Sequence, residues 1–193
     1  MRRFSNRHAI ALSPREAIVA AAARAYAAPA GSMMDAANEF QRLCALDHDD
    51  DTLFLPTWSV EDWQALFGRC ATVQVVSGSM VIQRGDNERA LYFVDSGALV
   101  AREPLGVLYH ERPGSVFGEV ALFDGRPRSV SVYAVKHSRL LRLEMSGLMA
   151  FGRQRPDLAN ELLLALGRVL AFRLRRAERR IDPEARNGVR AAH

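Results

Sequence analysis

The sequence has few cysteines and no long apolar stretch, and both shortages narrow the class of protein. Its 193 residues include two cysteines, Cys44 and Cys70, which are too few and too far apart for a disulfide framework or a zinc knuckle. We therefore expect reduced thiols and a cytoplasmic location. No apolar run approaches the length of a membrane span, and the proline and charged residues within 14–24 make the Ala-rich N-terminus a poor export signal.

Lysine is nearly absent: Lys136 is the only one, so arginine carries almost all of the positive charge. The net charge of +4 has two interpretations, an anionic partner or the codon bias of a GC-rich genome. Net charge by itself bears on solubility more than on function. With 49% hydrophobic and 25% charged residues, the composition fits one globular domain with an extension.

The most informative stretch of the chain is 117–132. Gly118 lets the backbone approach a ligand closely because it has no Cβ. Glu119 can accept a hydrogen bond from a hydroxyl, and 120–122 can form one helical turn whose free N–H groups face an anion. Arg128 offers a planar cationic fork suited to a phosphate, and Ser129 adds a donor beside it. These residues predict a site for a sugar phosphate.

This stretch resembles the phosphate-binding cassette of the cyclic-nucleotide-binding domain family, as found in the catabolite activator protein and other Crp/Fnr-type effector domains. The family pattern is Gly-Glu-x-Ala-Leu, a short loop, then Pro-Arg-(Ser/Thr/Ala)-Ala-x-Val, and the chain matches it at 118–122 and 127–132. Val130 departs from the pattern, because it stands where the family usually has alanine and would crowd the floor of the pocket. The resemblance extends over about residues 58–181, which we interpret as the cyclic-nucleotide-binding domain.

The resemblance implies a role for each cassette residue. Arg128 would bind the equatorial oxygens of a cyclic phosphate, and Glu119 would accept the ribose 2′-hydroxyl. The cradle would be completed by Ser129 and by backbone N–H groups of Gly118, Val120 and Ala121. The alternative is that Arg128 and Glu119 only pair with each other, on a roll that has lost its ligand.

Arg173 is the candidate contact for the base. Counting from Arg128 brings it to the C-terminal helix position where the catabolite activator protein has hydroxyl residues that touch adenine. An arginine there could stack on a purine or bond its acceptor edge, or it could be a solvated helix residue. Ser129 is compatible with cAMP and cGMP alike, and a cyclic dinucleotide is a third alternative. We expect no further cofactor and no metal.

From residue 71 onward, short apolar segments alternate with glycine-rich turns, which predicts a sandwich or a small barrel. The segments expected as strands are 73–75, 80–82, 91–94, 98–100, 107–109, 130–134 and 140–143. Taken with the resemblance, they predict an α+β, mainly β fold. Its centre would be an antiparallel jelly-roll-like β-roll over about 70–145, with the phosphate-binding cassette inserted between late strands.

Helices are expected before the roll. Residues 13–16 have the layout of a capping box for a helix through about Ala27, and Ser32 can cap a second helix through about Leu46. We interpret 1–57 as a packing or partner-docking extension that ends in an acidic linker. A short helix at 58–68 then leads into the roll with three large side chains turned inward, Trp63, Leu66 and Phe67.

A long helix over about 156–180, after a short one at 146–151, carries two apolar stripes. One stripe consists of Leu158, Leu162, Ala165, Val169 and Phe172. The other consists of Leu163, Leu166, Leu170 and Leu174. A helix that is apolar on two sides is buried on two sides, so one stripe would pack on the roll and the other on a second copy of the chain. We expect a homodimer through this C-helix.

We therefore interpret the chain as a cyclic-nucleotide sensor without enzymatic activity. Its ligand would reposition the C-helix, and its output would be an unidentified protein partner. The tail 182–193 is too short for a winged helix-turn-helix, and the basic cluster within 175–180 is typical of a solvated helix end, so we expect no DNA binding. Two alternatives stay open: a Crp/Fnr-type transcriptional regulator without a usual DNA-binding domain, and an interaction module with a degenerate pocket. A metal oxygenase on a similar roll needs more ligands than His110-Glu111.

Overall fold

The structure is a computed structural model that describes residues 32–45, 58–103 and 106–181. The expected helix ending near Ala27, the acidic linker and the tail 182–193 lie outside the described residues. The described helices are α2 (Met33–Ala45), α3 (Val60–Phe67), α4 (Glu119–Asp124), α5 (Met145–Gln154) and α6 (Pro156–Ile181). The strands are β1 (Ala71–Val75), β2 (Met80–Ile82), β3 (Ala90–Ser96), β4 (Leu99–Glu103), β5 (Gly106–Glu111), β6 (Val116–Phe117), β7 (Ser131–Ala134) and β8 (Ser138–Glu144).

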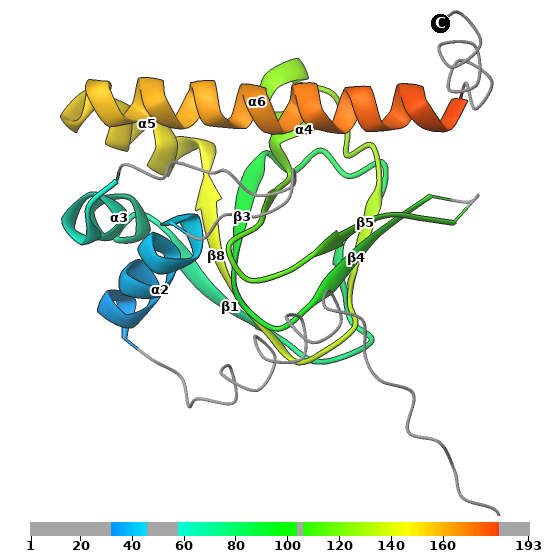
Figure 1. Ribbon diagram of the computed structural model, residues 1–193, viewed down its shortest axis with the longest axis horizontal. Helices are drawn as coiled ribbons and strands as arrows, with labels where there is room; N and C mark the ends of the chain where they lie inside the picture. The colour runs from blue at the N-terminus through cyan, green and yellow to red at the C-terminus, as the bar shows by residue number, and fades with distance from the viewer. Residues whose placement is uncertain (1–31, 46–57, 104–105, 182–193) are drawn as a thin grey trace, which may run out of the picture. The chain divides into compact units, whose positions relative to one another are not determined.

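In the described part of the chain, the strands form two antiparallel four-stranded sheets, ordered β1-β8-β3-β6 and β2-β7-β4-β5 (Figure 1). The two sheets enclose a roll, with α6 lying across one end of it. The predicted α+β, mainly β fold is therefore confirmed. All seven expected strands are present. The sequence pattern does not predict β6, because two residues are too few to show an alternation.

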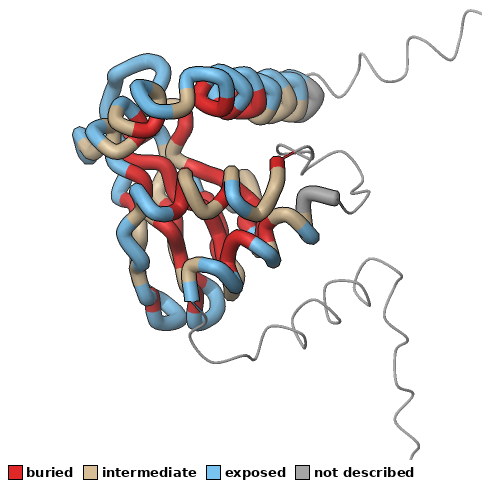
Figure 2. The backbone as a smooth tube through the Cα atoms, turned by 90° about the vertical axis from the view of Figure 1, so that its left-hand side faces the viewer, coloured by how far each residue is buried: buried red, intermediate tan, exposed pale blue. Residues whose placement is uncertain are grey.

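The central strand β3 shows how the sequence builds two cores. Its residues from Ala90 to Asp95 are all buried, because one face of the strand packs on helices and the other on the second sheet. Leu91 and Phe93 belong to the cluster shared with the helices, whereas Tyr92 and Val94 belong to the cluster between the sheets. Figure 2 shows buried residues gathered in the strands and exposed residues in turns and along the outer surface of the helices.

The N-terminal helix α2 packs on α3 and on β3. Ser32 caps α2, because its Oγ accepts a hydrogen bond from the backbone N–H of Asp35 at 3.3 Å, as the sequence predicts. The ring of Phe40 lies 5.3 Å from that of Trp63, 5.0 Å from that of Phe67 and 6.0 Å from that of Phe93. Aromatic clusters of this kind contribute about 0.5–1.5 kcal/mol per pair beyond their buried area. The helix is therefore an integral layer on the outer face of one sheet.

Helix α6 buries one face and leaves another open. The first predicted stripe faces inward: Leu158, Leu162 and Ala165 are buried, and Val169 and Phe172 are half-buried. The prediction that the second stripe faces away from the roll is only partly correct. Leu163 and Leu174 are exposed, but Leu166 is fully buried, because one turn beyond Leu162 the helix brings it back toward the roll. Neither α6 nor any other described helix combines the length and apolarity needed to cross a membrane.

Candidate functional site

The cassette begins at Gly118, in the turn between β6 and α4. Gly118 has a φ of 91°, in the left-handed region that favours glycine. A Cβ at this position would lie 2.6 Å from the Ala90 carbonyl oxygen and 2.7 Å from Arg128 Nη1, closer than real Cβ atoms approach. Glycine therefore lets the backbone of β3 and the Arg128 guanidinium close on the start of α4.

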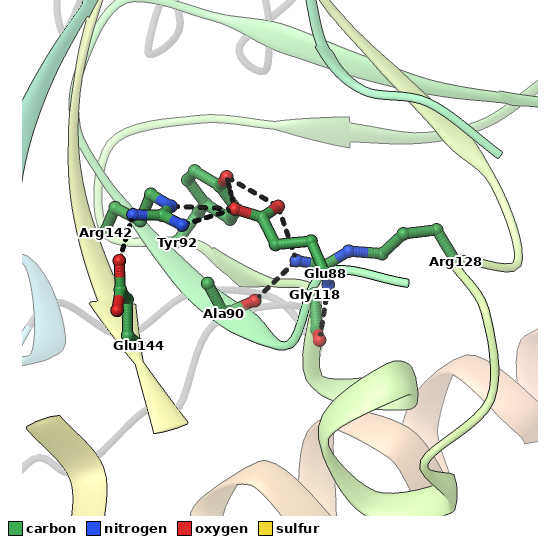
Figure 3. Close-up of polar contacts among 7 residues, drawn as sticks. All are labelled: Glu88, Ala90, Tyr92, Gly118, Arg128, Arg142 and Glu144. Atoms are coloured by element: carbon green, nitrogen blue, oxygen red, sulfur yellow. Dashed lines mark hydrogen bonds and ion pairs between the residues drawn. The ribbon is translucent and has the colours of Figure 1, made fainter. Parts of the chain in front are cut away.

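Arg128 is buried, with 4% of its surface exposed, and its guanidinium is turned toward β3 (Figure 3). Nη1 donates to the Gly118 carbonyl oxygen at 2.9 Å, and Nη2 donates to the Ala90 carbonyl oxygen at 2.9 Å and to Glu88 Oε2 at 3.2 Å. Nε is buried and has no hydrogen-bond partner. A buried donor without a partner costs about 1–3 kcal/mol, so the Nε–H group is a favourable place for an acceptor.

Glu119 is fully buried at the first position of α4. Its Oε1 accepts from Arg173 Nη1 at 2.7 Å, while its Oε2 has no partner. The carboxylate does not pair with Arg128, so the alternative in which these two residues only neutralise each other is wrong. Because Glu119 Oε2 is a buried acceptor and Arg128 Nε is a buried donor, the site has two open groups of opposite hydrogen-bonding character.

Arg173 reaches the site from α6 and joins it to the roll. Its Nη2 donates to Glu111 Oε1 at 2.8 Å and to the Val116 carbonyl oxygen at 3.0 Å, and its guanidinium lies 5.0 Å from the centre of the Tyr109 ring. Burial by itself would lower the pKa of Arg173, but the negative charges of Glu111 and Glu119 raise it. Arg173 is therefore a partly buried cation between two buried carboxylates, not a solvated helix residue.

These groups line one cavity of about 180 Å³. All seven residues predicted for the site meet there: Gly118, Glu119, Val120, Ala121, Arg128, Ser129 and Arg173. Its apolar wall includes Ile82, Ala101, Leu108, Val130 and Val132. Val130, the departure from the family pattern, is half-buried in that wall. The structure brings the predicted residues together, while their roles in binding stay predictions.

Three carboxylates are absent from the sequence-based prediction: Glu103 and Glu111, which line the cavity, and Glu88, which contacts Arg128. Glu111 alternates with Tyr109 along β5, so the two side chains share the strand face that lines the cavity, and this alternation could have indicated it. Glu88 precedes β3 and carries no such signal. Its contact with Arg128 depends on how the cassette folds back against β3, which no local pattern reports.

Comparisons with known proteins agree with this geometry. The family model described as "Cyclic nucleotide-binding domain" matches residues 72–155. The cyclic AMP receptor protein of Thermus thermophilus is 37% identical over 121 residues, which are 58% of this chain and 54% of that protein. The present chain thus spans about half the length of this relative.

Two solved structures share the fold. The catabolite activator protein of Thermus thermophilus is similar with a TM-score of 0.59 and 28% identity, over 68% of this chain and 62% of that one. A cyclic nucleotide-binding domain from Methylobacillus flagellatus gives a TM-score of 0.65 and 22% identity, over 80% and 86% of the two chains. The roll, the cassette and these matches define a cyclic nucleotide-binding domain. Residues 72–155 match the family model of the cyclic nucleotide-binding domain, and the relatives support a Crp-type domain there.

Proposed function

We propose that this protein is a regulatory protein whose β-roll binds cAMP or cGMP and which has no enzymatic activity of its own. The observation that carries the proposal is a pair of buried groups without a hydrogen-bond partner, the Arg128 Nε–H donor and the Glu119 Oε2 acceptor, on two residues that line one cavity. A cyclic nucleotide supplies what each lacks, since its phosphate oxygens accept hydrogen bonds and its ribose 2′-hydroxyl donates one.

The choice between cAMP and cGMP depends on the base. The similarity to a protein named cyclic AMP receptor protein favours cAMP. Ser129 lines the cavity and is compatible with either nucleotide. Both η nitrogens of Arg173 already donate to protein oxygens, so a base contact by Arg173 would involve the face of its guanidinium or an exchange of these bonds.

We also propose that the signal leaves the site through α6. Glu119 is the residue that a ribose hydroxyl would meet, and the same carboxylate holds Arg173 of α6 at 2.7 Å. A ligand that changes this bond changes the energy of one position of α6 relative to another, which is the differential interaction that regulation requires. The output would be an unidentified protein partner.

The exposed face of α6 supports the proposed homodimer. Leu164 and Leu174 are 65% and 61% exposed, and Leu163 is 39% exposed. Between them, Gly167 has open space around it and Ala171 is exposed, so a second helix could approach closely. A second copy of the chain would bury this face. Mass by light scattering, with and without cyclic nucleotide, is expected to give two copies per particle.

The experiment that tests the function is calorimetric titration of the full chain with cAMP, cGMP and cyclic di-GMP. We expect saturable binding of one of the first two. Arg128→Ala should weaken it by about a hundredfold or more, because the phosphate loses a charge-assisted hydrogen bond and its positive partner. Arg126→Ala is the matched control, since Arg126 is exposed in the same loop and its side chain does not line the cavity.

Each other outcome identifies a different class of protein. If the protein unfolds cooperatively but binds none of the three ligands, the chain is an interaction module with a degenerate pocket. Salt-dependent retardation of DNA would make it a transcriptional regulator with an unusual DNA-binding surface. The cytoplasmic location stays a prediction from the sequence.

A further inference from the structure

Glu88 lies in the segment before β3 and gathers three side chains around one carboxylate (Figure 3). Arg142 of β8 donates to Glu88 Oε1 from Nε at 2.8 Å and lies 2.7 Å from it at Nη2. The Tyr92 hydroxyl lies 3.1 and 3.0 Å from the two carboxylate oxygens, and Arg128 Nη2 donates to Oε2 at 3.2 Å. Tyr92 of β3 and Arg142 of β8 therefore hold the Glu88 carboxylate in place where it contacts Arg128 of the cassette.

The anchors of Glu88 are themselves fixed. Arg142 donates a further bond from Nη1 to Glu144 Oε1 at 2.6 Å. The ring of Tyr92 is stacked on that of Phe117, with 5.2 Å between centres and 7° between planes, and Phe117 immediately precedes Gly118. Burial alone would raise the pKa of Glu88, but its bonds to Arg142, Tyr92 and Arg128 lower it.

We propose that Glu88 is a positioning residue for Arg128, which sets the edge of the guanidinium that faces the bound phosphate. The inference rests on the proposed function. A guanidinium is a rigid fork, so fixing both η nitrogens fixes the direction of the Nε–H bond. The Gly118 and Ala90 carbonyl oxygens hold one edge of that fork. Glu88 supplies the third contact, and it is the only charged one that Arg128 makes among the described residues.

The arrangement has more contacts than neutralising the charge of Arg128 requires. Neutralising the charge of Arg128 would need only one nearby carboxylate at any angle. Here Glu88 is oriented by two further donors, and its side chain is only 33% exposed. Such a network restricts the side-chain conformations of Glu88 and Arg128, as expected where a ligand contact must keep one direction.

The test measures the orientation of the Arg128 guanidinium in addition to the affinity for the cyclic nucleotide. The two phosphorothioate diastereomers of cAMP, or of cGMP if that nucleotide binds, carry sulfur at one or the other exocyclic position. Sulfur is a weak acceptor, so the isomer with oxygen facing Arg128 should bind more tightly to the wild-type full chain. The ratio of the two dissociation constants therefore reports how well Arg128 is aimed.

We expect Glu88→Gln to weaken cyclic-nucleotide binding about tenfold and to move the diastereomer ratio toward one. Glu88→Asp keeps the charge but is one methylene shorter, so it should lower the diastereomer ratio with a smaller loss of affinity. This variant replaces Glu88→Gln in the test if Glu88→Gln does not fold. Glu61→Gln is the matched control, because Glu61 is exposed on α3 and does not line the cavity, and it should behave as wild type. Unchanged or tighter binding with the wild-type ratio in both Glu88 variants would overturn the proposal.

A second readout separates this proposal from the proposed function. In ligand-free protein, the nitrogen-15 spectrum should resolve the Nη groups of Arg128 separately, because their hydrogen bonds restrict rotation, and Arg128→Lys assigns them. In Glu88→Gln, faster rotation of the guanidinium should average the Nη signals of Arg128. If wild-type protein binds no cyclic nucleotide, the proposed function fails, and this spectrum still decides whether Glu88 orients Arg128. Unaltered Nη signals in Glu88→Gln would refute the orientation.

Discussion

Two arginine–carboxylate clusters each contribute an arginine to the same cavity, and they differ in what they join. The cassette cluster consists of Arg128, Glu88, Arg142 and Tyr92, and every member belongs to the roll or its loops. The helix cluster consists of Arg173, Glu111, Glu119 and Tyr109, and it connects the roll to α6. One cluster lies within the sheets, whereas the other crosses from a sheet to a single helix.

The difference indicates that the two clusters have separate roles in the site. Arg128 is held by Ala90 of β3 and by Gly118 and Glu88, which adjoin β6 and β3, so its side of the cavity has a fixed geometry. Arg173 holds a helix whose far face is exposed, so in the proposed function the ribose side is the part that responds. Each cluster leaves one group open, Arg128 Nε in the first and Glu119 Oε2 in the second. A ligand that engages both would couple the fixed side to the movable one.

The largest expected effect comes from breaking the helix cluster. Arg173→Met keeps most of the side-chain volume but leaves the buried Glu111 and Glu119 without their shared cation. Removing one partner of a buried ion pair typically costs about 3–5 kcal/mol of the free energy of unfolding. Chemical denaturation measures this loss, and hydrogen exchange should show faster opening of the C-terminal half of α6.

The matched control for that variant is Arg168→Met, on the exposed side of the same helix. It should change the free energy of unfolding by less than about 0.5 kcal/mol. A similarly small change in Arg173→Met would mean that the helix cluster does not hold α6, and the contrast between the two clusters would be lost.

An intermediate effect is expected where the cassette cluster meets the backbone. Gly118→Ala introduces a Cβ that would collide with the Ala90 carbonyl oxygen and with Arg128 Nη1, at a φ of 91°. We expect a loss of about 1–3 kcal/mol in stability together with weaker cyclic-nucleotide binding, because Arg128 must shift. Thermal denaturation and calorimetry measure the two quantities.

Glycine substitution has its own control in α5. A Cβ at Gly152 would make only an ordinary contact, 3.5 Å from Ala159 Cβ. Gly152→Ala should therefore stabilise the protein slightly, by about 0.5–1 kcal/mol, as expected inside a helix. Equal effects of the two substitutions would show that position 118 has no special constraint.

The smallest effect is the pH dependence of the cassette cluster. Hydrogen bonds from Arg142, Tyr92 and Arg128 outweigh burial and lower the pKa of Glu88 below its usual value of 4.5. A carboxyl whose pKa is lower in the folded state stabilises the protein above its unfolded pKa, and that contribution is lost as the pH falls through the folded pKa. Because Glu88 is a third exposed, the contribution should stay below about 1 kcal/mol.

Chemical denaturation of wild type and Glu88→Gln between about pH 6 and pH 3 measures this term. The difference in free energy of unfolding should be constant at the upper end and shrink toward the acid end. A difference that grows as the pH falls would contradict the sign of the pKa shift. Wild type should bind cyclic nucleotide most selectively in the range where Glu88 is ionised.

Much of the fold could be predicted from the sequence because its signals are local. The short apolar segments in β1, β3 and β8 and the glycine-rich turns between strands indicate a roll, and Ser32 indicates the start of α2. Leu166 shows the limit of such patterns. It fits a heptad-like stripe equally well on either side of α6, and the packing against the roll turned it inward.

The site was predictable to the extent that it is one continuous stretch. Gly118, Glu119, Arg128 and Ser129 lie within a dozen residues, so identity and spacing expose them together. Their partners do not. Arg173 and Glu119 are 54 positions apart, and Arg128 and Glu88 are 40 apart, so their contacts arise only when α6 and β3 come to the cassette.

The sequence by itself determined the class of domain and the cassette residues of its cavity, because glycine conformation and cassette spacing are properties of neighbours along the chain. Only the tertiary structure decided the pairing of charges: Arg128 with Glu88, and Arg173 with Glu119 and Glu111. Burial is the physical reason, since a charge removed from water must find a partner, and the fold sets which partner lies within reach.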